Sequence, residues 1–113
     1  MKIQKIKGEI SMEQSIIRHM ALFTLKHPLE SEQTEKFLND GENILSEIPI
    51  VKNFEVLRQV STMTNFDFGF SMEFKNQEDY MAYNNHPNHQ AFVEERWKKE
   101  VERFQEIDLI KKV

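Results

Sequence analysis

The chain has 113 residues, a formal net charge of −4, 39% apolar and 30% charged residues, and no cysteine. This length and composition are typical of one globular domain rather than a disordered chain. The chain is acidic overall and lacks the basic patch that nucleic-acid binding requires. The absence of cysteine excludes disulfides and thiolate chemistry. No apolar run approaches the ~18 residues of a membrane span. We therefore expect a soluble, cytoplasmic protein that binds neither nucleic acid nor membrane.

Residues 1–15 have weak periodicity and contain a single glycine, Gly8. Either this segment is a disordered arm or it adds a short strand, and the sequence leaves both alternatives open. We expect residues 16–113 to form one domain.

Residues 16–26 are predicted to form a strand with apolar side chains on both of its faces. One face holds every second residue from Ile17 to Leu25, including His19, and the other face holds Met20 and Leu22. A strand that is apolar on both faces is typical of a sheet covered on both sides. Pro28 ends this strand.

A helix is predicted to begin at Ser31, because acidic residues on either side of it suit the positive end of a helix. Its apolar residues keep to one helical face, and Pro49 ends it. Gly41 lies inside this helix, where glycine costs about 1 kcal/mol relative to alanine.

Two further strands follow, and the second of them has the strongest pattern in the chain. Residues 53–61 alternate only in part, whereas residues 66–75 place four phenylalanines and Met72 on one face and polar or small residues on the other. This period of two predicts a strand with one buried face. The short turn between them predicts an antiparallel hairpin.

The last part of the chain is predicted to form two helices and a short strand. Asn76 caps the first helix, which runs to Tyr83, and Pro87 begins the second. The second helix carries a stripe of Val93, Trp97, Val101 and Phe104, and residues 107–110 form the final strand.

The resulting order, strand-helix-strand-strand-helix-strand, predicts an α+β, ferredoxin-like fold with a four-stranded antiparallel sheet and helices on one face. The other face would be apolar and bare. A second copy of the chain is the simplest cover, since two sheets packed face to face form a barrel across a two-fold axis. The alternative is that this face is partly solvated.

Several segments together resemble the stress-responsive dimeric α/β-barrel (Dabb) family. The most specific is His-Pro-x-His with a tyrosine upstream of it. The resemblance covers residues 16–110. Its segments are Ile17-Arg18-His19-Met20, Ile48-Pro49-Ile50-Val51, residues 67–74, Glu78-Asp79, Tyr83, His86-Pro87-Asn88-His89, Phe92 and Asp108.

The resemblance implies a homodimer whose two sheets form a barrel. The family includes a polyketide cyclase that closes an aromatic ring by aldol chemistry. In the cyclase pattern the tyrosine and the second histidine of the motif perform acid–base work, which implies Tyr83 and His89 as catalytic residues here. The histidine of the first strand corresponds to His19. The chain departs from the cyclase at Phe68, where the cyclase has a histidine.

The chemistry of these residue types agrees with an acid–base role. A helix N-terminus disfavours imidazolium, so His89 would stay neutral and could act as a general base. Tyr83 could then donate a hydrogen bond to a developing enolate oxygen. We expect His19, Phe68 and His86 to line the pocket. The alternatives are that His86 caps its helix, that His19 is a satisfied core residue, and that Tyr83 and His89 only support packing.

Three functions are consistent with the sequence. The first is a cyclase, lyase or isomerase that acts on a small apolar or aromatic carbonyl compound in a pocket between the sheet and the helices. The second is a non-catalytic, stress-related binding or structural dimer. The third is a haem- or flavin-linked monooxygenase on the same barrel plan. We expect no metal, because the histidine spacing fits no zinc pattern, and no cofactor.

Overall fold

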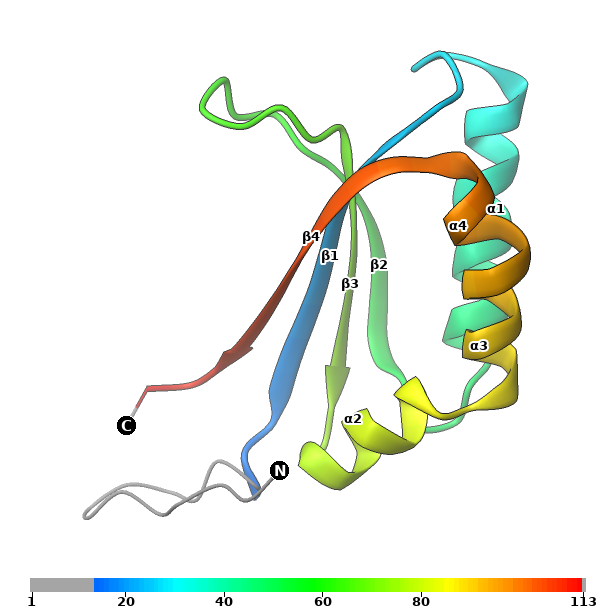
Figure 1. Cartoon of the computed structure of the whole chain (residues 1–113). Coiled ribbons are helices and arrows are strands. Elements are labelled where there is room, and N and C mark those ends of the chain that lie inside the picture. Colours follow the sequence, from blue (N-terminus) through cyan, green and yellow to red (C-terminus); the bar gives the residue numbers. More distant parts are fainter. Residues whose placement is uncertain (1–13, 113) are drawn as a thin grey trace.

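The computed structural model describes residues 14–112. Its sheet has four antiparallel strands in the order β2-β3-β1-β4 and is not closed, and all the helices lie on one side of it (Figure 1). The predicted ferredoxin-like plan is therefore confirmed. In chain order the elements are β1 (Ile17–Leu25), α1 (Glu32–Ser46), β2 (Lys52–Arg58), β3 (Phe68–Phe74), α2 (Gln77–Asn84), α3 (Pro87–Phe92), the π-helix η2 (Val93–Trp97), α4 (Lys98–Glu100) and β4 (Val101–Ile110).

Polar side chains start the helices where the sequence predicts. The Ser31 hydroxyl accepts a hydrogen bond from the Thr34 backbone N–H at 3.2 Å, and the Asn76 side chain accepts one from Asp79 N–H at 2.8 Å. Each bond satisfies a backbone donor that has no partner inside the helix. The segment 1–15 proposed as an arm or extra strand lies, for residues 1–13, outside the described part of the chain.

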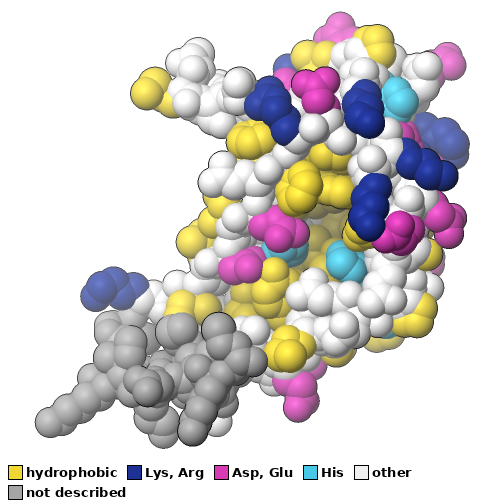
Figure 2. Space-filling view, viewed as in Figure 1, with side chains coloured by type: hydrophobic (Ala, Val, Ile, Leu, Met, Phe, Trp, Pro, Cys, Tyr) yellow, Lys and Arg dark blue, Asp and Glu magenta, His cyan; other side chains and the backbone are white. Residues whose placement is uncertain are grey.

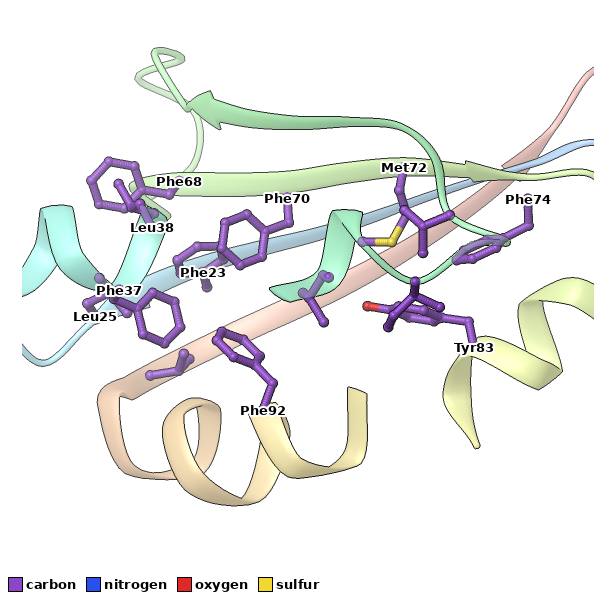
Figure 3. Packing of buried hydrophobic residues seen from close by; sticks show 14 residues of the cluster. Phe23, Leu25, Phe37, Leu38, Phe68, Phe70, Met72, Phe74, Tyr83 and Phe92 are labelled. Carbon is purple, nitrogen blue, oxygen red and sulfur yellow. The ribbon is translucent and has the colours of Figure 1, made fainter. Parts of the chain in front are cut away.

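The core is a layer of aromatic rings between the sheet and the helices (Figure 3). The alternating face of β3 is buried along its whole length, as its pattern predicts. Phe23 of β1 is 0% exposed and contacts the rings of Phe37, Phe70 and Trp97, with centroids 4.9–5.8 Å apart. Edge-to-face ring pairs at such distances add specific attraction to the hydrophobic gain of burial.

The helix predicted after Pro87 is wrong at its C-terminal end. The helical segment ends at Glu100. Val101 and Phe104, which the sequence placed in the apolar stripe of this helix, belong to β4. In β4, Phe104 lies opposite Phe23, and the ladder with β1 supplies the hydrogen bonds that a longer helix would have supplied. The final strand therefore starts at Val101 rather than at residue 107.

Close packing explains the glycine inside α1. A Cβ atom at Gly41 would lie 2.6 Å from Cζ of Phe70 and 3.2 Å from Cζ of Phe92. Replacing Gly41 with alanine should therefore cost stability, although alanine favours helix by about 1 kcal/mol. We expect Gly41→Ala to lower the free energy of unfolding by about 1–3 kcal/mol, the usual range for overpacking, in urea denaturation at fixed protein concentration. Asn39→Ala, on the exposed side of the same helix, should cost nothing.

The face of the sheet opposite the helices, hereafter the open face, has an apolar centre. In the strand register, Leu57 and Leu22 flank Gly69, and Met20 lies beside Ile107. Leu57 is 37% exposed, and Met20, Leu22 and Ile107 are half-buried. The open face is thus uncovered by the described residues. Among those residues, no helix is long and apolar enough to cross a membrane.

Candidate functional site

A cavity of about 330 Å³ lies between the sheet and the helices. Figure 2 shows it as a hollow with an apolar interior and with histidine and acidic side chains near its rim. This volume falls within the roughly 300–1,000 Å³ of small-molecule sites. Its main apolar walls are Leu45, Phe70, Met72, Phe92, Trp97 and Phe104, and its polar lining residues are Tyr83, His89, Lys98 and Glu106.

The turn between α2 and α3 brings Tyr83 and His89 together. Tyr83 comes from the last turn of α2 and is 2% exposed, and its hydroxyl points away from α2 into the interior (Figure 3). His89 comes from the first turns of α3, and its ring centroid lies 4.3 Å from that of Tyr83. Both catalytic residues implied by the resemblance thus line one cavity.

The hydrogen bonding of His89 leaves one ring nitrogen available as a base. Its Nδ1–H donates to the backbone carbonyl of Asn84 at 3.3 Å, so the neutral ring has its lone pair on Nε2. Burial lowers the pKa of His89 below its ordinary value, and the nearby His19 and His86 act in the same direction, while the bond to Asn84 opposes them. His89 is therefore neutral at pH 7, the form that can accept a proton.

The two tyrosines beside the cavity are held in their protonated form. Burial is the main cause that raises the pKa of Tyr83, with further contributions from Tyr80 and Glu106. Burial also raises the pKa of Tyr80, followed by its hydrogen bond to Asp108. A tyrosine with a raised pKa keeps its proton and acts as a hydrogen-bond donor.

A second polar cluster joins β1, β4 and α2 next to the cavity. His19 Nδ1 lies 2.6 Å from Asp108 Oδ1, and the Tyr80 hydroxyl donates to Asp108 Oδ2 at 2.9 Å. Because a carboxylate only accepts, Nδ1–H of His19 is the donor. The centroids of His19 and Tyr83 are 6.2 Å apart, so this cluster packs directly against Tyr83. The Asp108 carboxylate therefore fixes the orientation of the His19 ring, and His19 is buried, with 5% of its surface exposed.

The π-helix η2 forms the roof of the cavity. Val93 and Trp97 face the cavity. Arg96 donates to Asp40 of α1 at 2.6 Å and to Glu100 at 2.5 Å. The bond to Arg96 is the main cause that holds the pKa of Asp40 below its usual range. The roof is therefore tied to α1 by charged hydrogen bonds, and π-helical turns occur frequently at functional sites.

The other predicted pocket residues lie around the cavity rather than in its lining. His19 lies in the cluster with Asp108, and His86 caps α3 by accepting the Asn88 N–H at 3.1 Å. Phe68 is buried in the aromatic core, with its ring 6.0 Å from that of Phe23. Their roles toward a ligand stay predictions. Among residues 14–112, no group of three or more histidine or acidic side chains is arranged to hold a metal ion.

The sequence predicted no functional role for five residues that form or support the site, although it placed Trp97 in the helical stripe and Asp108 among the segments that resemble the family. Trp97, Lys98 and Glu106 line the cavity, and Tyr80 and Asp108 hold His19. Only Asp108 and Glu106 left a signal in the sequence. Both are acidic residues on the helix-facing side of an edge strand, where an apolar residue would be expected.

Fold and cavity together define a ferredoxin-like α+β domain with a cavity of small-molecule size between its sheet and its helices. The sequence profile of the stress responsive A/B barrel domain family, Dabb, matches residues 17–111. The chain therefore belongs to the Dabb family, and the resemblance noted from its motifs is confirmed.

Individual relatives agree with this assignment. A stress-response A/B barrel domain-containing protein of Arabidopsis thaliana is 32% identical over 90 residues, 72% of this chain and 74% of that protein. The crystal structure of a Dabb family protein of Mesorhizobium loti shares 50% identity with a TM-score of 0.87, covering 88% of this chain and 100% of that one.

Two more distant structures share the fold. A dimeric ferredoxin-like protein of Thermobifida fusca has 20% identity and a TM-score of 0.72, covering 91% of this chain and 97% of that one. The hydroxynitrile lyase of Passiflora edulis has 17% identity and a TM-score of 0.74, covering 88% of this chain and 95% of that one.

Proposed function

We propose that the cavity binds a small apolar or aromatic carbonyl compound and that Tyr83 and His89 remove a proton from the carbon next to the carbonyl. The observation that carries this proposal is the pairing of a protonated tyrosine with a neutral histidine, 4.3 Å apart by ring centroids, in an apolar cavity. An apolar cavity with a few convergent polar groups and perturbed pKa values is typical of an active site.

The chemical step follows from the two side chains. Nε2 of His89 accepts the proton from carbon, and the Tyr83 hydroxyl donates a hydrogen bond to the oxygen on which the enolate charge develops. The mainly apolar lining lowers the local dielectric constant, which strengthens that hydrogen bond. The enolate then takes a proton at another carbon or attacks a second carbonyl. Alternatively, Nε2 of His89 takes the proton of a β-hydroxyl group while the adjacent carbon–carbon bond breaks, and the electron pair of that bond forms the enolate. These outcomes are the reactions of an isomerase, a cyclase and a lyase.

Trp97 allows binding and chemistry to be tested separately. It is the single tryptophan of the chain and lines the cavity, so its fluorescence reports occupancy. Phenylacetone and 2-acetylnaphthalene in D₂O serve as probes, with deuterium uptake next to the carbonyl followed by NMR. We expect fluorescence titration to saturate and exchange to exceed the buffer rate. Saturation without exchange would favour the non-catalytic binding protein, and no titration at all would remove the ligand site.

We further infer that the protein is a homodimer in which two open faces pack together. The supporting observation is the uncovered apolar centre of the open face, formed by Met20, Leu22, Leu57 and Ile107. A sheet with an exposed apolar face requires a cover, and an isologous pair of sheets supplies one. The Thermobifida fusca protein, which shares the fold, is dimeric.

A charge in the centre of the open face should separate the two copies. We expect Leu22→Asp to be monomeric at micromolar concentration in sedimentation velocity, because an unpaired carboxylate would be buried between the sheets. Asn39→Asp adds the same charge on the exposed side of α1 and should remain dimeric. Circular dichroism confirms that both variants are folded. A Leu22→Asp protein that sediments like the wild type would contradict the proposed interface.

A further inference from the structure

The loop between β2 and β3 projects from the sheet and presents apolar side chains to solvent. Val60 and Met63, near its tip, are 85% and 91% exposed, the two highest values among the large apolar side chains described as exposed. Residues 59–66 carry no charged side chain, although 30% of the chain is charged. A tip that is both uncharged and apolar favours contact with a protein surface over contact with nucleic acid or water.

The loop is nevertheless internally ordered, mainly through the side chain of Gln59. Its Nε2 donates to the carbonyls of Phe66 at 2.7 Å and Thr64 at 3.3 Å, and its Oε1 accepts the Ser61 N–H. The Met63 N–H donates to the Ser61 hydroxyl at 3.0 Å. Ordering a loop costs conformational entropy. A loop that is already ordered and exposes apolar side chains therefore loses little further conformational entropy when it binds a partner.

The base of the loop is held by residues of the open face. Arg103 of β4 donates to the Asn65 side chain at 2.7 Å and stacks over the ring of Phe66, with its guanidinium carbon 5.2 Å from the centroid. The Thr24 hydroxyl of β1 donates to the Asn65 carbonyl at 3.3 Å. Thr24 and Arg103 are paired on the side of the sheet away from the helices. Figure 1 shows the loop, in green, reaching out on that side.

We propose that this loop is a clasp that binds a second copy of the chain, with Val60 and Met63 as its contact side chains. The proposal rests on the dimer inferred above. It commits to a second copy because the clasp is continuous with the open face, so a partner sheet packed there lies next to the loop tip. By two-fold symmetry each copy supplies one clasp and receives one.

The first experiment removes the apolar contacts and leaves the backbone of the loop intact. We expect Val60→Ser/Met63→Ser to raise the dimer dissociation constant at least about ten-fold in sedimentation equilibrium, the loss expected for two half-buried apolar side chains. Met81→Ser, which removes an exposed methionine from α2 on the helix side, should leave it unchanged. An unaltered constant in the double variant would overturn the clasp.

The second experiment uses the absence of cysteine in the chain, since one introduced thiol is then the only one. We expect Met63→Cys to react several-fold more slowly with a maleimide in the dimer than in the monomer formed by adding Leu22→Asp. Met81→Cys should react equally fast in both. If Leu22→Asp is monomeric and Met63→Cys nevertheless reacts with maleimide at the same rate in the dimer and in that monomer, the clasp is overturned but the dimer is not. A wild-type protein that is monomeric at micromolar concentration would instead overturn the dimer and the clasp with it.

Discussion

His89→Gln should lower the rate of deuterium exchange into an aryl ketone by about 10²–10⁴-fold, the contribution of a positioned general base. Glutamine keeps much of the volume of histidine and can still donate to the Asn84 carbonyl, but it has no basic nitrogen in place of Nε2. Saturation of the Trp97 fluorescence should therefore persist while exchange is lost. Tyr83→Phe should also slow exchange, through loss of the donor to the enolate oxygen.

The pH dependence of exchange gives a second readout of the same residue. Burial lowers the pKa of His89 from 6.5, so the wild-type rate should be constant above pH 6.5 and should fall as the pH drops through the lowered value. His89→Gln should lose this acid limb. His27→Gln serves as the control, because His27 bonds to Glu100 away from the cavity. An unchanged rate in His89→Gln would remove the proposed base.

The variant Phe23→Ala should cause the largest loss of stability, about 3–5 kcal/mol in the free energy of unfolding. Phe23 is 0% exposed and contacts four aromatic rings, and its neighbours come from the sheet, from α1 and from the roof of the cavity. Their backbones are fixed by hydrogen bonds, so they cannot collapse fully into the space left by the ring.

Urea denaturation at one protomer concentration measures this effect, because dimerisation makes the apparent stability depend on concentration. Met81→Ala removes a large apolar side chain that is 47% exposed and should cost less than about 1 kcal/mol. A loss in Phe23→Ala as small as that in Met81→Ala would show that the aromatic layer does not hold the sheet to the helices.

The parts of the fold that were predictable are those in which one physical demand sets the pattern. In β3, every second residue faces the apolar layer between the sheet and the helices, so Phe70, Met72 and Phe74 repeat every second position without interruption. Ser31 and Asn76 marked helix starts because an unpaired backbone N–H needs an acceptor wherever a helix begins.

The C-terminal strand was mispredicted because two demands act on it at once. β4 lies at the edge of the sheet and borders the cavity, so its helix-facing positions are Phe104, Glu106 and Asp108 rather than three apolar residues. That mixture hides the period of two, while the steps from Trp97 to Val101 and Phe104 also fit a helix. Pairing with β1 resolves the ambiguity, and pairing between distant segments cannot be read from local spacing.

The candidate site was likewise predictable where its residues are close in the sequence and unpredictable where they are distant. Tyr83 and His89 are six residues apart and belong to one motif, so their proximity could be predicted. His19 and Asp108 are 89 positions apart, and Tyr80 reaches them only because α2 folds back over the sheet. The cavity itself depends on how far the roof stands from the sheet, a property of packing for which no single residue is responsible.

The alternation along β1 divides the strand between two separate tasks. Ala21 lines the cavity and His19 lies on the same helix-facing side, whereas Met20 and Leu22 face the neighbouring protomer in the proposed dimer. Protein engineers can therefore redesign even-numbered positions to force pairing between two unlike chains while the odd-numbered positions stay untouched. Such a heterodimer, with one disabled protomer, would report whether each half turns over on its own.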